Sequence, residues 1–150
     1  MKKIILTAAL ILGFAVAASA QPRAIGIRIG DGAEVSYQHY LGNNFLEVDG
    51  GLDYAFDETF SVGATGIYNF MISEFENCWN FYAGPGAGVG LCIGETNYFA
   101  LSAAGMVGVE YNFKFPLQIS FDFKQHIGIG FNGNGIWTPS SIGLGLRYKF

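Results

Sequence analysis

Charged residues are scarce in this sequence. They make up 13% of its 150 residues, about half of the roughly 25% found in a typical soluble domain. The formal charge is −4 and no basic cluster is present, which excludes a nucleic-acid-binding surface. Hydrophobic residues reach 51%, so the chain is not intrinsically disordered. A water-soluble domain would lack the charge to cover its surface, and part of this surface must face something other than water.

Long apolar runs are also missing. The longest, Ile4–Val16, lies between two lysines and an Ala-Ser-Ala motif that ends at Ala20. This pattern predicts a secretory signal peptide, residues 1–20, because the run is shorter than the roughly 20 residues of a membrane-spanning helix. Cleavage would leave one domain, 21–150, with six basic and twelve acidic side chains and a formal charge of −6. That charge disfavours binding to nucleic acid or anionic lipid.

After residue 20 no helical periodicity is present, and apolar residues alternate with polar ones instead. Between Leu117 and Lys124, for example, every second side chain is apolar. A period of two over 8 to 12 residues predicts β-strands. Turn-forming segments divide the chain into eight of them, at 24–29, 33–41, 45–56, 60–71, 79–91, 98–111, 117–127 and 140–150. Short consecutive connections favour an antiparallel up-and-down arrangement that closes into a barrel and removes both exposed sheet edges.

The two faces of these strands predict which side is out. The polar face carries mainly Gly, Ser, Ala and about ten charges, too few to coat a soluble protein, so the apolar face should contact lipid. Aromatic residues also gather at the strand ends in two sets, as expected at two membrane interfaces. The first set is Phe45, Phe70, Trp79, Phe81, Tyr111, Phe113, Tyr148 and Phe150, and the second is Tyr54, Phe56, Phe60, Tyr98, Phe99, Phe131 and Trp137. We therefore predict an all-β, eight-stranded antiparallel transmembrane barrel. The alternative is a soluble periplasmic barrel with its apolar face inward around a small apolar ligand.

The last segment, Gly143–Phe150, resembles the terminal strand of Gram-negative outer-membrane barrels, which ends in an aromatic residue. Three glycine-rich segments, 24–30, 82–88 and 107–113, are similar to those of the small eight-stranded OmpA/OmpX-like barrels. This resemblance implies an outer-membrane location in a Gram-negative bacterium, contact with membrane lipid, and recognition of Tyr148 and Phe150 by the assembly machinery. It does not imply one activity, because the family includes membrane tethers, adhesion or serum-resistance proteins and lipid-modifying enzymes.

Charged residues on the inward face should pair, because an isolated buried ion costs several kcal/mol. Counting from the first turn places Arg28 opposite Glu34, and counting about Lys114 places Glu110 opposite Gln118 and Met106 opposite Asp122. We predict that the lumen is closed by a polar network of Arg28, Glu34, Glu47, Asp49, Asp53, Glu110, Asp122, Lys124, Arg147 and Lys149. A closed lumen favours a structural or surface-interaction role for a monomer, without catalysis or a cofactor. The alternative is a narrow gated path along four inward glycines, Gly84, Gly86, Gly88 and Gly90.

Catalysis on lipid would depend on His126. The deacylase pattern of a serine two residues after the histidine is absent, since Gly128 stands there. Asp122 is four residues away on the same face, roughly 13 Å along a strand, which is too far for a hydrogen bond. Ser140 or Ser141 could approach His126, so an outer-membrane lipid-modifying enzyme stays an alternative. The other histidine, His39, is expected at the membrane interface, and no Cys/His spacing indicates a metal site.

Only two cysteines are present, Cys78 and Cys92. On one strand they would lie roughly 46 Å apart, far beyond disulfide reach, and we expect them to be unpaired. The alternative is a hairpin that turns at Pro85-Gly86 and is closed by a disulfide. The longest connection is expected at 128–139, on the outward end if the N-terminus is periplasmic. Its aromatic residues make it a candidate contact for an extracellular partner, unless Trp137 simply ends the outer girdle.

Overall fold

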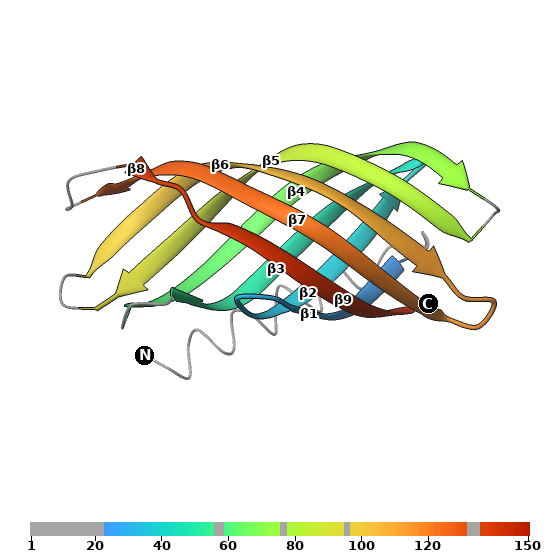
Figure 1. Ribbon diagram of the computed structural model, residues 1–150, viewed down its shortest axis with the longest axis horizontal. Helices are drawn as coiled ribbons and strands as arrows, with labels where there is room; N and C mark the ends of the chain where they lie inside the picture. The colour runs from blue at the N-terminus through green and yellow to red at the C-terminus, as the bar shows by residue number, and fades with distance from the viewer. Residues whose placement is uncertain (1–22, 56–58, 76–77, 95–96, 132–135) are drawn as a thin grey trace.

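The computed structural model describes residues 23–55, 59–75, 78–94, 97–131 and 136–150. Figure 1 shows strands that wrap around one long axis. The strands are β1 Arg23–Ile29, β2 Gly32–Leu41, β3 Asn44–Ala55, β4 Thr59–Phe75, β5 Trp79–Ile93, β6 Tyr98–Asn112, β7 Leu117–Phe131, β8 Ile136–Trp137 and β9 Ser140–Lys149. In this part of the chain, no helix is long and apolar enough to cross a membrane. The predicted signal peptide, residues 1–20, lies outside the described residues and stays a prediction.

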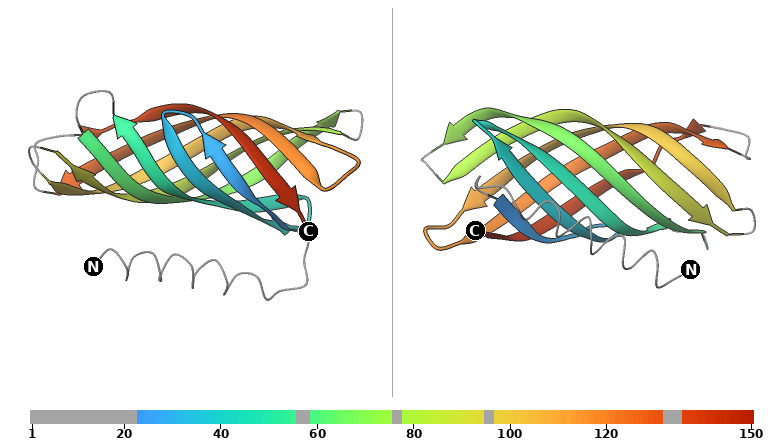
Figure 2. Two further views of the ribbon diagram at one scale, coloured as in Figure 1. Left: turned by 90° about the horizontal axis from the view of Figure 1, so that it is seen from below. Right: turned by 180° about the vertical axis from the view of Figure 1, so that it is seen from behind.

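Every strand pairs antiparallel with its neighbours, in the order β6-β5-β4-β3-β2-β1-β9-β7-β8, and pairing of β6 with β7 closes the sheet. The short β8 and the long β9 both pair with β7, so together they occupy the position of the eighth strand of the barrel. The predicted eight-stranded up-and-down barrel is therefore confirmed. Figures 1 and 2 show the two ends of the barrel. We call the end that carries β1's first residue and Phe150 the terminal end, and the opposite one the far end.

Two strands continue four residues past their predicted ends, β4 to Phe75 and β7 to Phe131. Within the added part of β7, Gly128 and Ile129 pair with β8. The expected loop 128–139 thus starts four residues too early and contains the short strand β8, although it ends where β9 begins, at Ser140. Only 132–135, outside the described residues, separates β7 from β8. The glycines that suggested a turn are needed for packing. A Cβ on Gly128 would lie 2.2 Å from the Leu101 carbonyl oxygen, and one on Gly130 would lie 2.8 Å from the Tyr98 ring.

The apolar face points outward, as predicted. On β7 the side chains of Ile119, Phe121 and Ile127 are between 39% and 62% exposed, whereas Gln118 and Lys124 on the other face are at most 1% exposed. The same alternation continues on β9. An outward apolar face contradicts the soluble barrel with an apolar interior, because such a barrel would bury these side chains.

Two residues assigned to the aromatic girdles are on the wrong face. Phe45 is fully buried, because it alternates in step with Glu47 and Asp49, the inward residues of β3. Tyr98 is on the inward face of β6 and packs its ring against Gly130. The other seven residues of the predicted first set lie on the outward face at the terminal end: Phe70, Trp79, Phe81, Tyr111, Phe113, Tyr148 and Phe150. At the far end Phe99 and Phe131 contact each other, with ring centres 5.9 Å apart.

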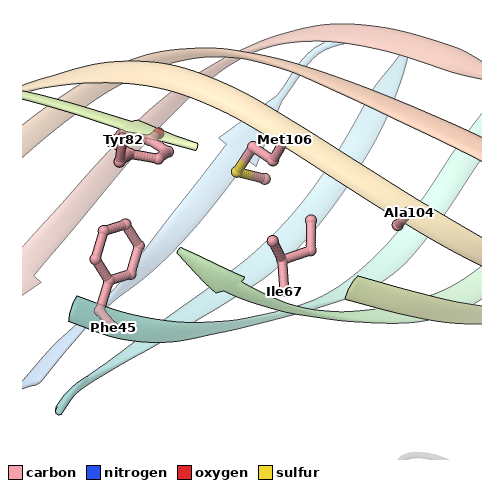
Figure 3. Close-up of a cluster of buried hydrophobic side chains, with 5 residues drawn as sticks. All are labelled: Phe45, Ile67, Tyr82, Ala104 and Met106. Atoms are coloured by element: carbon pink, nitrogen blue, oxygen red, sulfur yellow. The ribbon is translucent and has the colours of Figure 1, made fainter. Parts of the chain in front are cut away.

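An apolar plug fills one side of the lumen and was not foreseen. It consists of Phe45, Ile67, Tyr82, Ala104 and Met106, one or two from each of β3 to β6 (Figure 3). The rings of Phe45 and Tyr82 meet edge to face with centres 5.1 Å apart. Because these residues are isolated apolar side chains among inward polar ones, the alternation of the sequence does not reveal that they meet.

The cysteine-bearing segment is one continuous strand. β5 continues through Pro85 and Gly86 without a turn, since both pair with β6 and Gly86 also pairs with β4, so the alternative hairpin is wrong. Cys78 precedes the strand and Cys92 lies near its other end, and both thiols are free. The histidine expected at the interface, His39, lies on the outward face beside Tyr37, with 3.3 Å between its Nδ1 and the phenol oxygen.

Candidate functional site: the interior of the barrel

Five charged residues form an ion-pair belt across the lumen, namely Arg28, Glu34, Asp49, Asp122 and Lys124. Arg28 donates from Nη1 to Glu34 Oε2 at 2.9 Å and from Nε to Asp122 Oδ1 at 2.8 Å. Lys124 Nζ lies 2.9 Å from the same Glu34 oxygen and 2.7 Å from Asp49 Oδ2. The belt therefore joins β1, β2, β3 and β7. All five side chains are buried, so each charge depends on its partners rather than on water.

A second set of contacts surrounds Arg147, on β9. Its Nη2 donates to Glu47 Oε1 at 2.8 Å, its Nε to Ser36 Oγ at 2.9 Å, and its Nη1 to Ser120 Oγ at 2.7 Å. Gln38 donates to the other oxygen of Glu47 at 2.7 Å. One guanidinium thus uses its fork of donors to link β9 to β2, β3 and β7.

Glu110 is held in a different way, by carboxamides. It accepts hydrogen bonds from Asn80 at 2.9 Å, from Asn112 at 3.2 Å, and from Gln118. Lys149 Nζ donates to Asn112 Oδ1 at 3.0 Å. The Asn112 carboxamide thus links the Lys149 ammonium to the Glu110 carboxylate by two hydrogen bonds in series. Among the described residues, no cation lies within 4.0 Å of Glu110 as an ion-pair partner.

The predicted register about Lys114 is wrong. Glu110 pairs with Ser120, and Met106 pairs with Lys124, two residues away from the expected partners. The turn centres on Phe115 instead, because Phe113 N–H donates to the Leu117 carbonyl. The side chain of Gln118 still reaches Glu110, but diagonally. By contrast, Arg28 does pair with Glu34 across the first hairpin.

Nine of the ten residues assigned to the lumen network have described side chains, and all nine take part in these contacts. The backbone of Asp53 pairs with Gly32 and Ser61, but its side chain lies outside the described part. Five carboxylates and three cations are buried: Glu34, Glu47, Asp49, Glu110 and Asp122, against Arg28, Lys124 and Arg147. Sequence reasoning missed the uncharged members, such as Ser36, Gln38 and Asn80, because neutral inward residues carry no distinctive signal.

Bare glycine backbone makes room for both arginines. A Cβ on Gly143 would lie 2.4 Å from Arg28 Cζ, and one on Gly145 would lie 2.5 Å from Arg147 Nη1. Both glycines belong to β9, which pairs with β1 where the two ends of the chain meet. The two guanidiniums therefore occupy space that the Cβ of any larger residue at these positions would take.

His126 faces the lumen rather than lipid. Its Nδ1 lies 3.0 Å from Ser102 Oγ, on β6. Neither serine proposed from the sequence is found as its partner: Ser141 accepts a hydrogen bond from Arg28, and Ser140 pairs with Gln125. Ser102 was missed because only the register between β6 and β7 brings two inward residues 24 positions apart together.

A small cavity lies beside this pair. Its lining includes Glu34, Ser61, Thr65, Ser102 and His126 over a floor of glycines. The open volume is about 10 Å³, close to the least that can hold one water molecule. In the described residues no group of three or more His, Cys, Asp or Glu side chains is arranged to hold a metal ion.

Comparison with known proteins agrees with this geometry. A family described as outer membrane protein beta-barrel domain matches residues 24–150. The chain belongs to this family. It is an outer-membrane protein whose barrel contacts membrane lipid, and the soluble periplasmic alternative is wrong on this ground as well.

Solved structures share the fold at low identity. The crystal structure of Neisserial surface protein A is 15% identical, with a TM-score of 0.62 over 86% of this chain and 94% of that one. The N-terminal β-barrel domain of Pseudomonas aeruginosa OprF is 14% identical, with a TM-score of 0.59 over 86% and 96%. A de novo designed transmembrane β-barrel is 13% identical, with a TM-score of 0.52 over 88% and 98%. A comparison with curated proteins gives no match.

Proposed function

We propose that this protein is a closed, non-conducting outer-membrane barrel with a structural or surface-interaction role. The observation that carries the proposal is the filled interior: the ion-pair belt lies against β1, β2, β3 and β7, and the apolar plug projects from β3 to β6. An eight-stranded barrel has an interior that side chains can fill. An ion would have to break buried ion pairs to pass, so we propose that the gated path along the β5 glycines does not conduct.

Conductance tests the proposal directly. The purified protein is inserted into planar bilayers and into liposomes loaded with a potassium-sensitive dye. We expect no current steps and a leak equal to that of protein-free liposomes, while a porin inserted in the same way conducts. Steps whose frequency rises with the amount of inserted protein would contradict a closed barrel.

The last residue of β7 and the first residue of β8 support the surface-interaction part of the proposal. Phe131 is 50% exposed and Ile136 is 76% exposed at the far end of the barrel, which we place at the cell surface. We propose that these two side chains contact an extracellular partner. Replacing both residues with serine should reduce adhesion of cells that display the protein, without changing its amount in the outer membrane. Unchanged adhesion at equal display would assign these side chains to the lipid interface instead.

Assembly in the membrane is the second interaction that we propose. Tyr148 and Phe150 point outward at the end of the chain, with ring centres 6.3 Å apart. These two exposed aromatic side chains are the feature that we propose the assembly machinery binds. Deleting Phe150 should lower the amount of folded protein in the outer membrane of cells, yet leave refolding of the purified chain in detergent unchanged. Equal losses in both assays would show that Phe150 contributes only to stability.

We also propose that the protein does not modify lipid. Support comes from the position of His126, whose ring is directed at Ser102 in the lumen rather than at the lipid-facing surface. A long acyl chain outside the barrel has no access to this pair through the intact wall. Incubation of the protein with phospholipid and lipopolysaccharide, followed by mass spectrometry of the lipids, should show no product.

A further inference from the structure

Three polar side chains from three strands meet in front of Gly88, on β5. They are Thr65 from β4, Ser102 from β6 and His126 from β7. A Cβ on Gly88 would lie 3.1 Å from both Thr65 Oγ1 and Ser102 Oγ, and 3.0 Å from His126 Cε1. The missing side chain therefore leaves a small polar space, which belongs to the cavity described above.

Within this group, Ser102 and His126 have the relationship of a nucleophile and its base. The distance from Ser102 Oγ to His126 Nδ1 is 3.0 Å, within the reach that proton transfer needs. Ser102 is 5% exposed and His126 is half-buried. The Gly88 carbonyl, at 3.3 Å, is the other acceptor near the hydroxyl. When Nδ1 carries no proton, the shorter contact favours donation from Ser102 to the imidazole.

We propose that Ser102 is a covalent acylation site that His126 activates. The co-reactant is an activated ester of a short carboxylic acid that enters the lumen from the far end. Ser102 Oγ attacks the carbonyl carbon and forms a new C–O bond, while its proton passes to His126 Nδ1. The bond to the leaving alcohol breaks, and that alcohol takes the proton from His126. The products are an acyl-serine ester, the free alcohol and the original histidine.

The size of the cavity limits the class of acyl group. An open volume of about 10 Å³ is close to that of one water molecule, so it excludes a long chain and limits the acyl group to acetyl, which would have to displace that water. The acyl group then fills the space in front of Gly88 that a hydrolytic water would need, so the acyl-serine is the end product. This inference goes beyond the proposed function: it describes one stoichiometric modification inside the barrel, rather than turnover of a substrate.

The test uses the purified protein folded in detergent, with p-nitrophenyl acetate as the probe. We expect up to one equivalent of p-nitrophenolate per barrel, and an acetyl group on Ser102 in the peptide mass spectrum. The octanoate ester should not react at Ser102. Ser102→Ala should abolish the label, and His126→Asn should slow labelling by about 100-fold or more, the usual share of a general base. Ser140→Ala removes an exposed serine that does not line this cavity and is the matched control, which should react like the wild type.

Gly88→Ala provides a second route, because its Cβ would occupy the space within 3.1 Å of Thr65, Ser102 and His126 while both reacting side chains are retained. It should suppress labelling, and the shift in electrophoretic mobility between heated and unheated samples reports that each variant is folded. The proposal is overturned if the folded wild type gives no acetyl group on Ser102. It is equally overturned if folded His126→Asn labels Ser102 at the wild-type rate.

Discussion

Arg28 and Glu34 lie opposite each other across the first hairpin and form a buried ion pair, with 2.9 Å between Nη1 and Oε2. Only six residues separate them, so the hairpin alone brings them together. The same two side chains then reach Asp122 and Lys124 on β7, which are 94 and 90 residues away in the chain. A local pair thus becomes part of a network that exists only when the barrel is closed.

Removing one partner of the Arg147–Glu47 pair should destabilise the barrel strongly. Arg147→Met leaves Glu47 buried without its cation, and we expect a loss of about 3–5 kcal/mol in the free energy of unfolding. The measurement is urea unfolding of the protein in lipid vesicles, followed by tryptophan fluorescence. Adding Glu47→Leu to Arg147→Met should recover much of the loss, because the double variant no longer buries an unpaired charge.

Lys114→Met is the control for this experiment, since Lys114 is exposed in the turn between β6 and β7. It should change the stability by less than about 0.5 kcal/mol. If Arg147→Met were as mild as this control, the buried network would not contribute to holding the barrel closed.

Two glycines on neighbouring strands should respond in opposite ways to alanine. A Cβ on Gly84 would lie 1.9 Å from the Tyr68 carbonyl oxygen, which is part of the sheet and unable to move aside. Gly84→Ala should therefore prevent folding or lower the unfolding midpoint in urea clearly. Gly105 has nothing within 4 Å of the same position, and Gly105→Ala should leave the midpoint within error. A similar response at both positions would contradict the packing described for β5.

Gln125 donates hydrogen bonds to backbone carbonyls at the break between β8 and β9, which consists of Thr138 and Pro139. Its Nε2 donates to the carbonyls of His126 at 2.8 Å, Pro139 at 3.2 Å and Thr138 at 3.4 Å. Water cannot replace these bonds on a lipid-facing surface. Gln125→Leu should cost about 1–3 kcal/mol in urea unfolding, whereas Ile127→Leu, on the same face of β7, should be close to neutral. Equal stability of the two variants would mean that the break needs no donor.

The two cysteines should differ in reactivity and should not form a disulfide. Cys92 is 2% exposed, whereas Cys78 is half-buried just outside β5. In the folded barrel a maleimide should label Cys78 alone, and denaturation should reveal the second thiol. Cys78→Ser should abolish labelling of the folded protein. Mobility that depends on reductant, or rapid labelling of Cys92, would contradict this arrangement.

Several features of the interior could be predicted from single strands, and others could not. The inward position of Glu47 and Asp49 follows from alternation, and the Arg28–Glu34 pair follows from counting across a tight turn. The register of β6 against β7 was missed by two residues, because the turn between them centres on Phe115 rather than Lys114. Turn geometry, which sets this register, depends on backbone hydrogen bonds that residue types do not specify.

Glycine was the least informative residue. Gly128 and Gly130 suggested a loop, but they lie within β7, where neighbouring backbone and the Tyr98 ring leave no room for a side chain. The apolar plug was missed for a related reason, since Phe45 and Tyr82 meet only across the lumen. The wrong loop and the missed apolar plug have the same cause: each depends on which residue of another strand lies next to the residue in question.

The sequence by itself determined that this protein is a lipid-facing barrel of eight strands, because alternation with a period of two is local and each residue's neighbours along the strand reveal its face. Which inward groups meet was decided only by the tertiary structure. Arg28 pairs with Asp122, Arg147 pairs with Glu47, and Ser102 forms a hydrogen bond with His126 only because barrel closure and strand register bring distant strands side by side. A contact across the lumen depends on the register of every strand pair between the two residues, and each register is set by a turn. An error of two residues in one turn therefore changes which side chains meet.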